Sequence, residues 1–166
     1  FWSASSFNGD ISKWDVSSVT NTKTMFRAAK IFNGDLWKWD VSSVTNMHGM
    51  FANTKHLNND ISKWTVSSVT TFEDMFYTAE GFNRDLNLWD VSGATNMKRM
   101  FYLAKSFSQT LCGAWATAKA DKTAMFTGSS GKISSDKSKC SGVHVFVFAV
   151  CECFGTCLDA VSYTHL

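Results

Sequence analysis

The side chains best suited to metal chemistry lie together near the C-terminus. Cys151, Cys153 and Cys157 form a C-x-C-x-x-x-C spacing, and His144 precedes them. Thiolates and imidazoles bind zinc, but a convincing zinc site pairs its cysteines as C-x-x-C. Calcium loops need closely spaced carboxylates such as D-x-D, which this chain lacks. The sequence therefore predicts no metal site and no cofactor.

No other set of residues is typical of catalysis. The chain has no Ser/His/Asp arrangement, no glycine-rich phosphate loop and no paired acids outside its periodic columns. His48 and His56 occupy unrelated positions in the periodic pattern, so we expect solvated histidines rather than a shared site. We therefore expect a protein that is not an enzyme.

Lysine, aspartate and serine recur at a fixed spacing and form the best candidate binding surface. The alternation Lys-Trp-Asp-Val-Ser is that of a strand with one buried face, which directs the polar side chains outward. Two interpretations stay open: a solvated face in which Lys and Asp offset like-charge crowding, or a concave face that binds a partner. The residues are Lys13, Asp15, Ser17, Lys38, Asp40, Ser42, Lys63, Ser67, Asp90 and Ser92.

Four aromatic residues are candidate anchors for a partner. Three share one column with Arg27 and Ala52, and a column that accepts arginine is expected to face solvent. The fourth stands where other repeats have serine or asparagine. Packing of these side chains along the protein surface is the alternative interpretation. The four are Trp2, Trp37, Tyr77 and Tyr102.

These columns arise from a repeat of 25 residues, which has to be recognised before anything else. Each of the first four repeats has the spacing Ile-x-x-Trp-x-Val-x-x-Val or a close variant, which is the apolar spacing of leucine-rich repeats. The sequence predicts an α/β fold, a leucine-rich-repeat-like solenoid with one short parallel strand and one short helix per repeat. The Met-Phe pair that marks the repeat begins at Met25, Met50, Met75, Met100 and Met125.

The short helix is predicted from a change of period after the strand. Met47, Met50, Phe51 and Thr54 have the i, i+3, i+4, i+7 spacing of an amphipathic helix. A threonine stands just before each such segment and suits a helix N-cap. Asparagines that recur in one column, from Asn8 to Asn83, are expected to form a hydrogen-bonded ladder up the stack.

The repeat suggests three parts. Residues 1–126 are the predicted repeat solenoid; it begins inside a repeat, so we expect a truncated N-terminus, and its last repeat is degenerate because Trp115 comes one place late. Residues 127–142 are polar and read as a linker. Residues 143–166 are an uncertain tail, and its last six residues resemble translated sequencing-adaptor sequence, so a translation artefact is one interpretation.

Composition excludes some partners. The net charge is +2, and lysine and aspartate alternate rather than cluster, so we expect no nucleic-acid binding. The apolar run 143–158 is too short and too interrupted for a membrane span, so membrane attachment is expected only through segments outside this sequence. All five cysteines lie at Cys112 or later, so the regular repeats indicate neither a disulfide framework nor a redox compartment.

The string FNGDISKWDVSSVTN with its following Met-Phe closely resembles the repeat of BspA-like leucine-rich-repeat surface proteins, of the type found in mycoplasma lipoproteins. Thr65, Gly93 and Ala94 depart from that pattern. The resemblance implies an extracellular or cell-surface protein that binds a protein or glycan in adhesion, and it carries over no catalytic residue. A structural spacer or stalk is the alternative. Ice binding is a lesser one, through Thr20, Thr45, Thr70 and Thr95.

Overall fold

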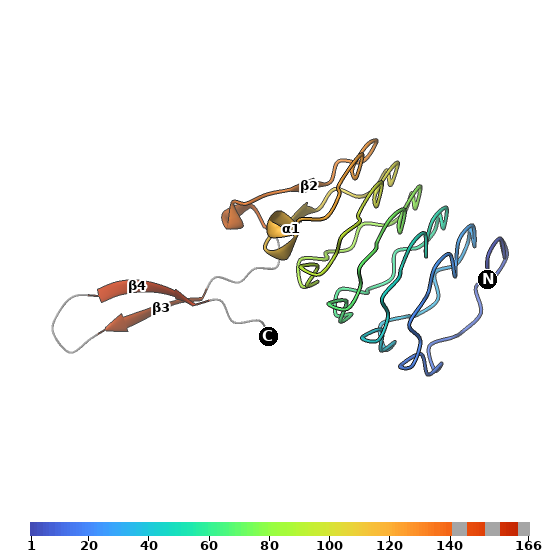
Figure 1. Ribbon diagram of the computed structural model, residues 1–166, viewed down its shortest axis with the longest axis horizontal. Coiled ribbons are helices and arrows are strands. Elements are labelled where there is room, and N and C mark those ends of the chain that lie inside the picture. The colour runs from blue at the N-terminus through green and yellow to red at the C-terminus, as the bar shows by residue number, and fades with distance from the viewer. Residues whose placement is uncertain (141–145, 152–156, 163–166) are drawn as a thin grey trace.

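The computed structural model describes residues 1–140, 146–151 and 157–162. Its regular elements there are β1 (Thr110–Leu111), α1 (Ala114–Thr117), β2 (Lys132–Ile133), the 3-10 helix η1 (Lys137–Lys139), β3 (Phe146–Cys151) and β4 (Cys157–Ser162). Strand β1 pairs parallel with β2, and β3 pairs antiparallel with β4. All of these elements begin at Thr110 or later, so the regular repeats consist of turns and irregular backbone (Figure 1).

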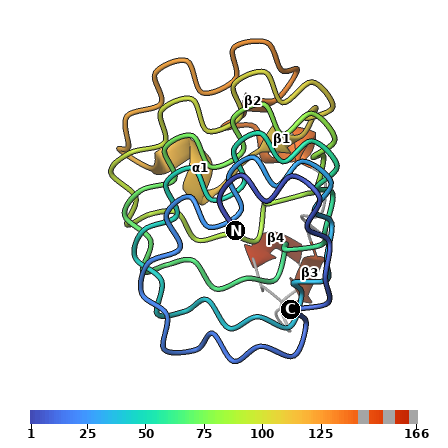
Figure 2. The ribbon, with the colours of Figure 1, turned by 90° about the vertical axis from the view of Figure 1, so that its right-hand side faces the viewer.

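Each repeat forms one coil, and successive coils lie on one another in register (Figures 1 and 2). Single parallel bridges join equivalent residues of neighbouring coils: Asn21 to Asn46, Asn46 to Thr71, Thr71 to Asn96, and Asn96 to Asp121. Because the repeat length is constant, every column of the sequence becomes a column in space.

The segment after each bridge, where we expected a short helix, is a run of turns. Its amides alternate in their partners: that of Met25 donates to the carbonyl of Thr22 at 3.1 Å, and that of Phe26 to the carbonyl of Met50 in the next coil at 2.9 Å. Thr24 and Ala28 have φ of 54° and 59°. A right-handed helix has no such residues, so the expected helix and its threonine N-caps are absent from the described repeats.

The helical pattern nevertheless identified the buried residues. Met47, Met50, Phe51 and Thr54 are all fully buried. The expected strand behaves in the same way: within residues 38–41, Trp39 and Val41 are buried and the other two exposed, yet that segment forms no ladder. In the internal coils the spacing of apolar residues thus predicted which side chains enter the core, and not the backbone that carries them. In the first coil Trp14, which we also expected to be buried, is 48% exposed.

Stacked phenylalanine rings run the length of the core. Ring centroids of Phe26 and Phe51 lie 5.7 Å apart, those of Phe51 and Phe76 5.8 Å, and those of Phe76 and Phe101 5.4 Å. The planes of these pairs differ by 7°, 15° and 6°. Such pairs add attraction beyond the area that they bury, so the ring column stabilises the spacing between coils.

Tryptophans form a second column and also tie the coils together with hydrogen bonds. The indole N–H of Trp64 donates to the carbonyl of Leu36 at 3.0 Å, and that of Trp89 to Ile61 at 3.0 Å. Trp115 donates to Leu86 at 3.0 Å and is fully buried, although it comes one place late in the sequence. Helix α1, which contains Trp115, accommodates this one-place shift, so the last repeat keeps its core.

The asparagine column forms the expected ladder, but between side chain and backbone. The Oδ1 of Asn33 accepts from the amide of Asn58 at 2.9 Å, and the Oδ1 of Asn58 accepts from the amide of Asn83 at 3.1 Å. Ser108 continues the column as a donor to Asn83 at 3.1 Å. Each asparagine therefore satisfies a backbone group that the irregular coil would otherwise leave without a protein partner.

The residues that we expected to be a linker, 127–142, pack on the last coil as far as Cys140. The amide of Ser130 donates to Phe107 at 3.1 Å, β2 pairs with β1, and a disulfide joins Cys112 to Cys140. The stacked unit thus extends past residue 126. In the tail, β4 supplies the partner of β3, and the rest of the segment 143–166 lies outside the described residues.

Removal of one ring from the phenylalanine column tests this packing. We expect Phe76→Ala to lower the free energy of unfolding by about 3–5 kcal/mol, because the cavity forms between rings on both sides. Chemical denaturation followed by tryptophan fluorescence measures the loss. Phe1→Ala is the matched control: Phe1 belongs to the same column but is 38% exposed. An equal loss in both variants would contradict the stacked core.

Candidate binding surface

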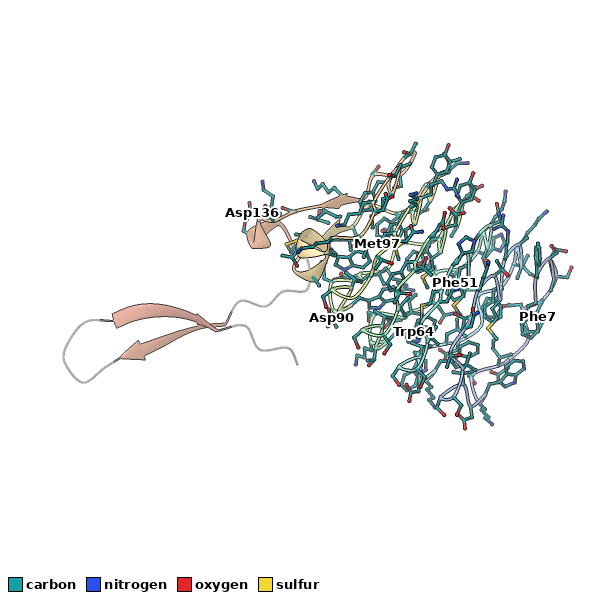
Figure 3. All side chains as sticks on the ribbon, in the orientation of Figure 1. Phe7, Phe51, Trp64, Asp90, Met97 and Asp136 are labelled. Atoms are coloured by element: carbon teal, nitrogen blue, oxygen red, sulfur yellow. A yellow bond between two sulfur atoms is a disulfide. The ribbon has the colours of Figure 1, made fainter. Side chains whose placement is uncertain are left out.

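The lysine, aspartate and serine columns lie on a rim of successive turns, which we call the turn edge: residues 12–18, 37–43, 62–68 and 87–93. In the second coil, the amide of Trp39 donates to the carbonyl of Leu36 at 3.0 Å, and that of Val44 to Val41 at 2.9 Å. Figure 3 shows Asp90 at this rim and Trp64 further inside. The structure therefore presents the predicted site residues on turns rather than on a strand.

The aspartates of the turn edge close its turns. The Oδ1 of Asp15 accepts from the amide of Ser17 at 3.0 Å and from its hydroxyl at 2.7 Å. Asp40 and Asp90 accept from the amides of Ser42 and Ser92 at 3.0 Å each. These bonds hold the pKa of all three carboxyls below the usual value, the serine hydroxyl being the largest cause. The aspartates and serines thus have a structural role first.

The lysines of the turn edge are exposed and accessible to a partner. Lys13, Lys38 and Lys63 all lie at the surface. Ser67 is exposed too, and Thr65 stands in its coil where the others have aspartate. The closing of the turns therefore accounts for the predicted aspartates and serines, but not for the lysines.

Trp37 is the aromatic residue that projects from the turn edge. Its side chain is 56% exposed, and the Nζ of Lys38 lies 4.9 Å from the ring centroid. A hollow of about 200 Å³ lies beside it, lined by Asp35, Trp37, Asp60 and Lys63. The sequence identified Trp37, but no signal indicated the hollow, since its lining comes from two coils.

The other three predicted anchors lie elsewhere on the coil, next to the run of turns. Tyr77 and Tyr102 stack with centroids 5.0 Å apart, and the guanidinium of Arg99 lies 6.0 Å from the Tyr77 ring. Both tyrosines are half-buried, and Trp2 is exposed on the first coil. The structure therefore does not bring them together with Trp37.

Charged residues outside the turn edge pair between coils. Glu80 lies 3.3 Å from the Nζ of Lys55 and 3.4 Å from that of Lys105. The hydrogen bond from Lys55, followed by the charge of Lys105, lowers the pKa of Glu80. Exposed pairs of this kind contribute little stability. They show that glutamate is accepted in a column that holds lysine in the neighbouring coils.

In the part of the chain that the structure describes, no three His, Cys, Asp or Glu side chains cluster to hold a metal. His144 and Cys153 lie outside the described residues, and Cys151 and Cys157 are paired positions of β3 and β4. Among the described helices, none has the length and apolarity needed to cross a membrane.

Asp121 makes the stability of the last coil depend on pH. Its carboxylate accepts from the hydroxyl and amide of Thr123 and pairs with Lys98 at 3.2 Å, which lowers its pKa to about 2. A depressed pKa means that the ionised form favours folding. This stabilisation is present above the unfolded pKa of about 3.9 and disappears as the pH falls towards 2.

We expect Asp121→Asn to remove part of the acid sensitivity between pH 4 and 2 while it keeps the turn. Asparagine occupies this column in Asn46 and Asn96, where its Oδ1 accepts from the amide two residues on. Denaturant midpoints measured across that pH interval provide the test. Curves for the variant and the wild type that stay parallel throughout would contradict the assignment.

Comparison with known proteins gives a family and no closer relative. No curated protein and no solved structure matches the chain. The family model described as "Mycoplasma protein of unknown function, DUF285" matches residues 1–79 and 35–139, which together make up most of the chain and include the stacked residues after 126. The chain therefore belongs to this Mycoplasma-type repeat family.

Proposed function

We propose that the chain is a solenoid module of the BspA-like leucine-rich-repeat type, which acts outside the cell or at its surface. It binds a protein or glycan through the turn edge and has no catalytic activity. The family match supports the Mycoplasma-type repeat, and the sequence resemblance supports the surface role.

The observation that carries the proposal is the exposed cationic and aromatic surface of the turn edge. Lys13, Lys38 and Lys63 are exposed and Trp37 projects among them. The aspartates beside them are fixed by hydrogen bonds to the following serines. A surface whose turns are held rigid loses little conformational entropy when it binds, and exposed tryptophan is enriched at binding hot spots.

The disulfide supports an extracellular location. Cys112 is buried in the last coil, and its bond to Cys140 fastens the segment that covers the end of the core. Disulfides persist in oxidising environments and are rare in the reducing cytosol. The sequence alone did not pair these cysteines, because one of them lies in the segment expected to be a linker.

Two other functions have some support. The unbroken ring column favours a rigid spacer or stalk. Ice binding is supported by the exposure of the threonine column, which includes Thr45, Thr70 and Thr95. Their hydroxyls donate to the carbonyl of the threonine in the preceding coil at 3.1, 3.2 and 3.1 Å, which holds the column in register. Thermal hysteresis measured in a solution of the protein would favour ice binding.

Charge reversal on the turn edge tests the binding function. We expect Lys38→Glu with Lys63→Glu to reduce binding to immobilised mucin by at least about ten-fold, because both cations are lost from the rim. Biolayer interferometry measures binding to mucin before and after periodate oxidation of its sugars, which separates glycan from protein recognition.

The control reverses two lysines outside the turn edge. Lys23→Glu with Lys30→Glu makes the same change in net charge, in columns where Glu73 and Glu80 already occur. We expect this variant to bind mucin like the wild type. An equal loss in both variants would indicate a non-specific charge effect and contradict a binding role for the turn edge. No binding by the wild type would favour the spacer.

A further inference from the structure

Trp37 is not needed by the turn that carries it. Its amide donates to the Oδ1 of Asp35 at 3.2 Å, and the amides of Ser12 and Ser62 make the same bond to Asp10 and Asp60 at 2.9 and 3.0 Å. The turn is thus closed equally well by serine. The indole, 56% exposed, adds apolar surface at a place where the fold gains little from it.

The hollow beside Trp37 has balanced charge. Carboxylates of Asp35 and Asp60 line it together with Lys63, and Lys38 lies over the indole. Two acids and two lysines leave no net charge, which disfavours a strongly anionic or cationic ligand. The carboxylates can only accept hydrogen bonds and the ammonium groups can only donate them, so a ligand must offer both.

The size of the hollow sets a further limit. Its volume of about 200 Å³ is below the 300–1,000 Å³ typical of sites for drug-sized ligands, so it holds a single ring. The electron-rich face of an indole attracts C–H groups that carry partial positive charge. A pyranose has one face of C–H groups and a periphery of hydroxyls that both donate and accept.

We propose that this hollow binds one neutral pyranose unit of a glycan, with its C–H face on Trp37 and its hydroxyls bonded to Asp35, Asp60 and Lys63. The inference rests on the interaction function proposed above and names the ligand class for one part of the turn edge. A quaternary amine would also suit an indole, and choline is the probe for that alternative. Phosphate would be repelled by the two carboxylates that line the hollow.

The test uses the full chain labelled with nitrogen-15. Seven tryptophans give indole N–H signals, and Trp37→Ser identifies the signal of Trp37 by its absence. Methyl β-D-glucopyranoside, methyl α-D-mannopyranoside and N-acetyl-D-glucosamine are titrated in turn, with choline and inorganic phosphate as contrasting probes. We expect at least one sugar to shift the Trp37 signal with millimolar affinity, as befits so small a ligand.

Matched variants complete the design. Serine already fills this column in Ser12 and Ser62, so Trp37→Ser is expected to fold; it should weaken sugar binding at least ten-fold in calorimetry. Asp60→Asn keeps the Oδ1 acceptor of its turn, removes the charge and should also weaken binding. Ile31→Ser, which replaces an exposed apolar residue outside the turn edge, should leave sugar binding unchanged.

Several results would overturn the proposal. These are a Trp37 signal that no sugar moves, one that only choline or phosphate moves, or sugar binding that survives Trp37→Ser.

The experiments distinguish a failure of this proposal from a failure of the proposed function. Mucin binding that is sensitive to Lys38 and Lys63, without a sugar-induced shift, would leave the turn edge as a protein-binding surface. A sugar-induced shift without mucin binding would leave the hollow as the site and contradict the wider role.

Discussion

The backbone of each coil is held by hydrogen bonds to the coil one repeat further along. The amide of Phe51 donates to the carbonyl of Met75, and the amide of Phe76 to that of Met100, both at 2.9 Å. These bonds form only if successive repeats keep the same length in this segment. The one-place shift of Trp115 falls in α1, and the bridge from Asn96 to Asp121 keeps the 25-residue register.

This register explains why the core and the surface differ in their freedom to vary. A core position must match the same position in the coils before and after it, so rings stack on rings and each internal indole reaches a carbonyl of the preceding coil. A turn-edge position must only close its own turn, which Ser12, Trp37 and Ser62 do equally. Substitutions at the turn edge therefore cost little stability, and a ligand-binding side chain can arise there without disturbing the stacked coils.

Much of this was predictable from the columns of the sequence, because burial follows apolar spacing whatever the backbone does. Met50 and Phe51 were correctly expected to be buried, and the asparagine ladder was expected from identical residues in register. The sequence could not show that the segment after each bridge is a run of turns and not a helix, since the same apolar spacing fits both structures. The positive φ at Thr24, Asp74 and Arg99 carries no sequence signal either, because that column holds unrelated residue types. The hollow beside Trp37 needs neighbouring coils in space, which no single repeat contains.

After each bridge in the described repeats every second amide, such as that of Phe51, donates to the next coil, and none closes an α-helical turn. Scalar couplings across hydrogen bonds, measured by NMR on protein labelled with carbon-13 and nitrogen-15, identify each acceptor directly. The structure predicts a coupling between the amide nitrogen of Phe51 and the carbonyl carbon of Met75. A coupling from Phe51 to the carbonyl of Met47, four residues earlier as in an α-helix, would contradict the account.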